Sequence, residues 1–394
     1  MQRFWGRLSL AGALMLPGIA EAEGDRPIDL DARYIADVLH VAHGGLRGGT
    51  RYIDELQLTA SIDSSALGWS GGELFVYGMA NTAGNFGDLH LGEFQKVSNI
   101  DTRPAVHLYE AWYEHQLASD RLSLRAGLYD FNSEFDSNPP AKLFLQSSHG
   151  IGVEIAQTGQ NGPSIFPVTS LAARLAWHAE GYYVQAAVLD GVPGDPADVR
   201  RTTIKLGGGD GALLAVEGGY QWDRGGFALG AWGYTAKFDD LLRMDAAGNP
   251  IKRSDNRGVY GYVNATVTGE TSGRHLDAFL RAGAAQAAIN PVSTFIGAGL
   301  VLERPFASRS NDSAGIAIAI AKTGDPFRRV GLLAGSPVSG AETTIEATYR
   351  AQITPWFVVQ PDVHVVIHPG FDPARRHAVV VGARFEISPF ALLH

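Results

Sequence analysis

The sequence predicts an all-β protein, a transmembrane antiparallel β-barrel. Three observations support this prediction: apolar and polar residues alternate along many short segments, aromatic residues gather near the segment ends, and an export signal begins the chain. Composition alone, with 48 Gly and no Cys among 394 residues, fits a secreted soluble β protein as well as a membrane barrel. The elements along the chain decide between the two.

Residues 1–22 have the features of a secretory signal peptide. Arg3 and Arg7 precede the apolar stretch Leu8–Ile19, and small residues end at Ala22. This stretch is interrupted by Pro17 and is shorter than the roughly 20 apolar residues that a spanning helix needs. We therefore predict cleavage after Ala22 and export of the remaining chain.

The mature chain is predicted to form one domain. Residues 23–50 are expected to be an N-terminal segment with a short helix over Ala32–His43, residues 51–388 a single barrel, and residues 389–394 a C-terminal tail. No later segment offers 18 consecutive residues free of charge and Pro, which excludes helical membrane spans.

Alternation with a period of two is the main signal of structure. It is clearest at residues 56–62, 121–129, 171–177, 259–267, 276–282, 345–353 and 379–387, which are separated by turn residues. A β-sandwich also alternates, but here Trp and Tyr near the segment ends (Tyr220, Trp222, Tyr349 and Trp356) match the aromatic girdles of membrane barrels. At the usual strand length, the chain accommodates roughly 16 to 18 strands, wide enough for an aqueous channel.

The stretch Val106–Leu117 supplies the first candidate functional residues. Extended geometry places Glu110, Trp112 and Glu114 on one face. Sugars are bound by aromatic rings under their C–H faces and by charged groups at their hydroxyls, so this face is a candidate sugar contact. The alternative is that Glu110 and Glu114 pair with Arg residues on neighbouring strands and hold the barrel wall.

Further charged and polar residues are expected to line the same pore. They are Arg125, Tyr129, Asp130, Glu134, Glu346, Arg350, Asp362, His364, Arg384 and Glu386. A lining of both signs offers hydrogen bonds to neutral hydroxylated solutes without holding one ion tightly.

Other functions are disfavoured by the sequence. The 41 acidic residues outnumber 32 Lys and Arg, giving a net charge of −9, so nucleic acid is not an expected partner. Ser148 and His149, read as adjacent strand residues, face opposite ways and are not a nucleophile and base. His364 and His368 lie about 13 Å apart along a strand, too far to share a metal. We expect no enzyme activity, no cofactor and no metal; whether the loop containing Asp190 binds Ca²⁺ stays open.

Several stretches resemble the carbohydrate-selective porin family, also called outer-membrane porin B. They are residues 97–101, 108–117, 124–136, 143–152, 358–370 and 378–388. The resemblance implies a barrel of about 16 strands with inward-folding loops in the Gram-negative outer membrane. It also implies passive passage of small sugars such as glucose through a pore lined by charged and aromatic residues.

The expected partners follow from this resemblance. They are mono- or small oligosaccharides, outer-membrane lipid and lipopolysaccharide, and the outer-membrane assembly machinery. The barrel is expected to be either a monomer or a homotrimer. A general diffusion porin for small hydrophilic solutes is the alternative function, and a glycan-binding outer-membrane or exported protein is a weaker one. The tail after Ser388 departs from the family, whose last strand usually finishes with a terminal aromatic residue. Phe385 and Phe390 are the candidates for that role here.

Overall fold

The computed structural model describes residues 27–117 and 121–389. The predicted signal peptide, residues 1–22, and the tail after residue 389 lie outside these ranges. Among the described residues, neither helix has the length and hydropathy that crossing a membrane requires.

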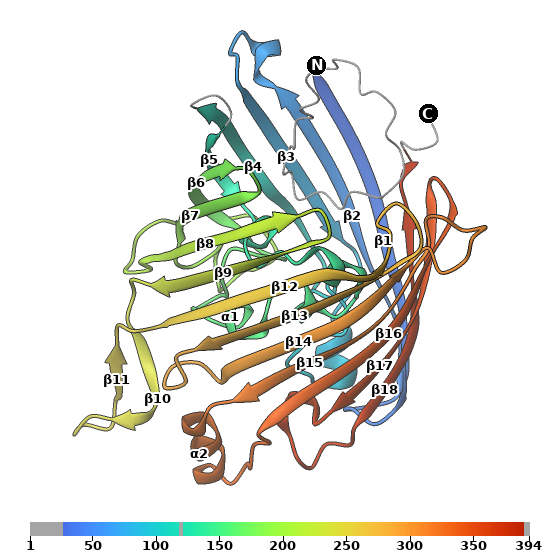
Figure 1. Ribbon diagram of the computed structural model, residues 1–394. Coiled ribbons are helices and arrows are strands. Elements are labelled where there is room, and N and C mark those ends of the chain that lie inside the picture. Colours follow the sequence, from blue (N-terminus) through green and yellow to red (C-terminus); the bar gives the residue numbers. More distant parts are fainter. Residues whose placement is uncertain (1–26, 118–120, 390–394) are drawn as a thin grey trace.

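Sixteen antiparallel strands close into one barrel, which confirms the predicted fold class (Figure 1). Neighbouring strands follow the chain order, and β1 pairs with β18 to close the ring. The strands are β1 (Ile28–His43), β2 (Gly49–Asp63), β3 (Gly72–Asn81), β4 (Ala105–Leu117), β5 (Leu122–Tyr129), β6 (Ser170–Ala179), β7 (Tyr182–Asp190), β8 (Ala212–Trp222), β9 (Gly225–Tyr234), β12 (Arg257–Gly269), β13 (His275–Ala285), β14 (Val292–Glu303), β15 (Ser313–Thr323), β16 (Ala341–Thr354), β17 (Phe357–Ile367) and β18 (Ala378–Ile387).

The remaining elements lie in the connections between barrel strands. Strands β10 (Phe238–Met244) and β11 (Pro250–Arg253) form a separate hairpin between β9 and β12. The helices are α1 (Val153–Ala156) and α2 (Asp325–Leu333), with single turns at Ser64–Leu67, Gly87–Leu91, Phe131–Ser133, Pro139–Leu143, Ser147–His149 and Pro369–Phe371.

The alternation in the sequence separates the two faces of the barrel wall. Leu124, Leu175 and Val263 are 44%, 46% and 42% exposed, as expected of side chains that face lipid. Their immediate neighbours Arg125 and Arg174 are buried in the interior. On these strands the exposed apolar side chains are thus on the outer face and the charged ones on the inner face, the reverse of a soluble protein.

The helix expected over Ala32–His43 is wrong: these residues belong to β1, and the barrel starts at residue 28 instead of residue 51. Both faces of β1 carry apolar residues, which removes the alternation that marks other strands. Ile35 and Leu39 pack inward against loop residues, whereas Val38 on the opposite face is 39% exposed.

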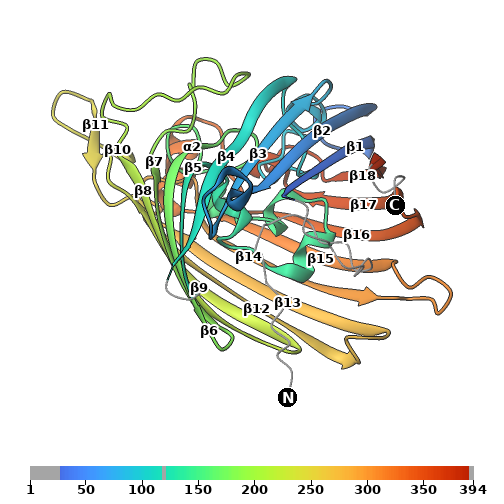
Figure 2. The ribbon, with the colours of Figure 1, turned by 90° about the horizontal axis from the view of Figure 1, so that it is seen from above.

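Two long loops fold into the barrel: residues 82–104 (loop A) and residues 130–169 (loop B). Figure 2, which looks down on the ring, shows loop B inside it. The loops bind each other through their backbones: Asn99 N donates to Leu145 O (2.8 Å) and Ser147 N donates to Lys96 O (2.9 Å). The space inside the strands is therefore narrowed by two joined segments.

Loop B is attached to the barrel wall on several sides. Asp136 N donates to Glu217 Oε2 on β8 (2.8 Å), and Gln360 Nε2 on β17 donates to Leu143 O (2.8 Å). Because β8 and β17 are far apart in the ring, these bonds hold the loop across the interior rather than against one strand.

Candidate functional site

A β-bulge in β4 decides which of its side chains face the interior. Tyr77 of β3 pairs with Glu110, while the next residue, Gly78, pairs with Leu108, so Tyr109 is the extra residue. Leu108 is 44% exposed on the outer face, whereas Glu110 is buried inside, although regular alternation would put both on the same face. The bulge therefore turns the acidic half of β4 towards the lumen.

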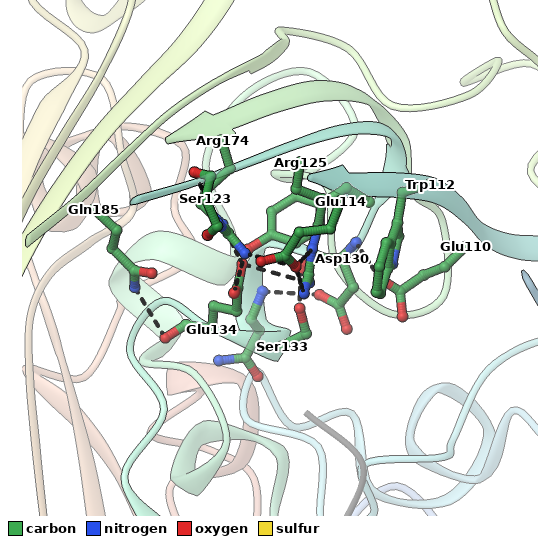
Figure 3. Close-up of polar contacts among 12 residues, drawn as sticks. Glu110, Trp112, Glu114, Ser123, Arg125, Asp130, Ser133, Glu134, Arg174 and Gln185 are labelled. Atoms are coloured by element: carbon green, nitrogen blue, oxygen red, sulfur yellow. Dashed lines mark hydrogen bonds and ion pairs between the residues drawn. The ribbon is translucent and has the colours of Figure 1, made fainter. Parts of the chain in front are cut away.

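Four buried charges join β4, β5 and β6 to loop B (Figure 3). Arg125 Nε donates to Glu114 Oε2 (2.8 Å). Arg174 donates from Nε to Glu134 Oε2 (2.9 Å) and from Nη2 to Glu134 Oε1 (2.6 Å), and it also reaches Glu114 Oε2 (3.2 Å). Two guanidinium groups thus neutralise two carboxylates, and Glu134 brings the loop into this charge cluster.

Trp112 belongs to the wall rather than to an open surface. Its side chain is 4% exposed, the Phe75 ring stacks on it at a centroid distance of 4.9 Å, and the Arg125 guanidinium carbon lies 3.7 Å from its ring centroid. These contacts cover the ring, so the structure offers no open indole face for the sugar contact expected at Trp112. Two wall groups, not a solute, stack on the indole.

Asp130 connects loop B to the bulge. Tyr109 OH donates to Asp130 Oδ2 (2.7 Å), and Asp130 N donates to Glu110 Oε1 (3.0 Å). Burial raises the pKa of the Asp130 carboxyl to about 6. The extra residue of the bulge thus anchors the first turn of the loop.

Lys142 of loop B and Asn99 of loop A are exposed residues beside the buried charges. Lys142 is exposed although protein surrounds most of it, which is the situation of a side chain that lines a channel. Burial lowers the pKa of its ammonium, and the Asp130 charge opposes that effect. Asn99 is exposed and accepts a hydrogen bond from Arg384 Nη2 (2.8 Å). Sequence analysis missed both, because loop residues have no periodicity; the one signal was a lone Lys in the run 137–153, which contains no other Lys, Arg, Asp or Glu.

The last strands hold a second set of charges beside β1. Arg384 donates to Asp37 from Nε (2.7 Å) and Nη2 (2.9 Å), and Ser98 Oγ of loop A donates to the same carboxylate (2.7 Å). Nearby, Arg33 and Arg350 both donate to Glu386 Oε2, at 2.5 and 2.9 Å. Arg33 and Asp37 were missed because that segment was predicted to be helical.

A third set lies on β16 and β17. Glu346 accepts hydrogen bonds from Leu145 N (2.6 Å) and Gln146 N (3.1 Å) of loop B. Asp362 and His364 lie beside it, and all three side chains are buried. Within the described ranges, they form a group whose ligand atoms lie close enough to share a metal ion.

The structure thus places the thirteen predicted residues in three interior groups instead of one pore lining. Eleven are buried, and Asp130 and Arg350 are partly exposed. The alternative weighed for Glu114, pairing with Arg on a neighbouring strand, is what the structure contains. Most of these side chains are therefore covered by the loops that they hold.

Comparisons with known proteins agree with this architecture. Residues 47–388 match the model of the carbohydrate-selective porin, OprB family. Porin B of Pseudomonas aeruginosa is 23% identical over 401 residues, covering 92% of this chain and 87% of that protein. The high-pH structure of Pseudomonas putida OprB superposes with a TM-score of 0.81 at 22% identity, covering 92% of this chain and 94% of that one. The outer-membrane channel DcaP of Acinetobacter baumannii has a TM-score of 0.52 at 8% identity, with 92% and 96% coverage.

Proposed function

The chain belongs to the carbohydrate-selective porin family of the Gram-negative outer membrane, and from that premise we propose that it admits small neutral sugars such as glucose by passive diffusion. The observation that carries the sugar preference is the open position of Lys142 near Asp130, on a loop that narrows the barrel. An ammonium group and a carboxylate at the same narrow part of the pore offer hydrogen-bond donors and acceptors to sugar hydroxyl groups. Because the two charges are opposite, neither cations nor anions are strongly repelled.

Rigid attachment of loop B supports selectivity over general diffusion. The charge cluster of Glu114, Arg125, Glu134 and Arg174 binds one side of the loop, and Glu346 binds the other. A pore discriminates between solutes only if its width and polar groups keep their positions, and buried charge pairs on several strands fix both. The buried residues predicted as pore lining thus act by positioning.

An enzymatic alternative has less support from the geometry. Ser148 and His149 lie in a single helical turn, not on a strand as expected, and both are buried. The His149 ring packs near Phe144 and Phe279, at centroid distances of 5.1 and 5.8 Å. Burial lowers the pKa of its imidazole to about 3, so it is a poor base for activating a hydroxyl.

Liposome swelling tests the proposal. We expect purified protein in liposomes to admit glucose-sized sugars faster than amino acids and organic acids of similar mass. Protein-free liposomes are the control, and barrel insertion is checked by the faster gel migration of the unheated protein. Equal entry of all solutes would make it a general diffusion porin. No swelling after confirmed insertion would contradict a pore and favour glycan binding.

A further inference from the structure

A buried acidic and histidine group on β16 and β17 has no role in the proposed pore. Glu346 and His364 face each other as paired residues of these strands, and Asp362 is two positions from His364 on the same face. The side chains of Glu346 and His364 have no exposed surface, and Asp362 is 2% exposed. One ligand atom from each residue lies within 4.8 Å of the others.

In the described part of the chain, Asp362 and His364 lack hydrogen-bond partners, whereas Glu346 accepts two hydrogen bonds from loop B. Both Asp362 carboxylate oxygens and both His364 ring nitrogens lack a hydrogen bond. Asp362 Oδ1 and His364 Nε2 lie 2.5 Å apart and Glu346 Oε2 and His364 Nδ1 lie 3.9 Å apart. Among the described residues, no Lys or Arg forms an ion pair with Glu346 or Asp362. Two carboxylates buried in this way need a positive charge, which either a protonated His364 or a bound cation supplies.

We propose that Glu346, Asp362 and His364 bind one divalent transition-metal ion of the zinc class. A dication balances two carboxylates, and an imidazole nitrogen favours zinc and its neighbours over calcium or magnesium, which prefer oxygen alone. The convergence of unpartnered oxygens and nitrogens in a dry site is the arrangement that metal ligands adopt.

His149 of loop B lies near this group, although it is not among the residues whose ligand atoms lie within 4.8 Å of one another. Neither of its ring nitrogens has a hydrogen-bond partner, its side chain is 6% exposed, and its charge interacts with that of His364. Zinc sites in proteins commonly take four ligands, so these three residues would leave one position for a water molecule or a small movement of His149. Because Glu346 also accepts hydrogen bonds from Leu145 and Gln146, the ion would tie loop B to the wall.

Metal content tests the proposal. The protein is purified from cells grown with added Zn²⁺, without a histidine tag, and zinc per chain is measured by mass spectrometry. We expect about one zinc ion per chain in the unmodified protein. In His364→Ala and Asp362→Asn the content should fall by about tenfold or more, since losing even outer-shell partners of a metal costs about 10–100-fold in affinity.

Two control variants test whether zinc is bound elsewhere on the chain. His107→Ala removes another buried histidine with an unpartnered nitrogen and should leave the zinc content unchanged. The double variant His368→Ala/His377→Ala removes a histidine pair with a ring-centroid distance of 4.9 Å at the loop after β17 and should also leave it unchanged. Zinc that disappears with this pair but persists in Asp362→Asn would overturn the assignment.

A second measurement covers variants that fail to fold. The unmodified protein, refolded with Co²⁺, should show the visible absorption of cobalt bound by nitrogen and oxygen ligands, and Zn²⁺ should displace it. An unmodified barrel that migrates as folded but takes up neither metal would overturn the proposal. The charge of the two carboxylates would then be balanced by a proton shared among Glu346, Asp362 and His364. Neither zinc content nor cobalt absorption depends on sugar conduction, so the metal site and the sugar pore are tested independently.

Discussion

At the residue scale, Lys142 is the side chain best placed to set the charge preference of the pore. We expect Lys142→Gln to shift the selectivity towards cations, because it removes an accessible positive charge from the narrowed interior. The reversal potential of a planar bilayer in a KCl gradient measures this shift. Lys252→Gln is the matched control, since Lys252 is 62% exposed in the hairpin outside the barrel and pairs with Asp239. Identical shifts in both variants would contradict a place for Lys142 in the pore.

Trp112 should matter for stability more than for direct contact with sugar. Trp112→Ala is expected to lower the free energy of unfolding by about 3–5 kcal/mol, as for other buried aromatic residues, and to free Arg125 from its stacking partner. Urea unfolding in detergent, followed by gel migration, measures the loss. Trp69→Ala, at a position 59% exposed, should change stability little. Equal losses would show that Trp112 is not packed in the wall.

The sequence indicated the residue types of the site but not their accessibility. Period-two spacing correctly grouped Glu110, Trp112 and Glu114 on one face, and their burial pattern agrees. It could not show that loop B covers that face, because a contact between Glu134 and Arg174 depends on the path of the loop across the lumen. Lys142 and Asn99 were missed for the same reason.

At the scale of elements, the charge cluster attaches loop B to three strands. We expect Arg174→Met to lower the free energy of unfolding by about 3–5 kcal/mol, because it leaves Glu114 and Glu134 buried with one cation between them. Chemical unfolding measures the effect, and bilayer recordings should show noisier currents from the loosened loop. Arg200→Met, which breaks an exposed pair with Asp198, should have no measurable effect. Similar losses in the two variants would contradict the anchoring role.

Loop A contains a carboxyl group whose protonation should tie its stability to pH. Burial raises the pKa of Glu93 from its ordinary value of 4.5 to about 8, with nearby Lys96 opposing the rise and Glu342 adding to it. Between these values the folded chain holds a proton that the unfolded chain has released, so the free energy of unfolding falls as pH increases. Above pH 8 this loss is complete.

Glu93→Gln should remove that part of the pH dependence. We expect the difference in unfolding free energy between pH 5 and pH 8 to be smaller in this variant than in the unmodified protein, as measured by urea titration at each pH. Glu270→Gln, an exposed residue in the turn after β12, is the matched control and should behave as the unmodified protein does. Parallel pH profiles for all three would show that Glu93 ionises normally.

Strand prediction succeeded where one face meets lipid and the other meets polar groups. Residues 121–129 and 276–282 alternate in this way and match β5 and β13. It failed at β1, whose inner face packs on loop A and whose outer face meets lipid, so both are apolar. It also missed the bulge at Tyr109, since an extra residue changes the register without changing the composition.

At the scale of the whole molecule, an acidic barrel should favour cations in a salt-dependent way. The net charge of −9 raises the local concentration of cations at the mouths and in the lumen. We expect the cation preference in reversal-potential measurements to weaken between 0.1 M and 1 M KCl, as the Debye length falls from about 10 Å to about 3 Å. If the cation preference does not change with salt, it arises from a few charged groups that contact the ions closely and not from the overall charge.

The junction of β1 and β18 is held from within by loop A. Asp37 and Arg384 face each other across this junction, and Ser98 and Asn99 of loop A bind the same two side chains from within. Since β1 and β18 are the first and last strands of the chain, the barrel closes at this junction. A barrel that closed without loop A in place would leave Asp37 without Ser98 and Arg384 without Asn99, so the closed junction and the docked loop stabilise each other.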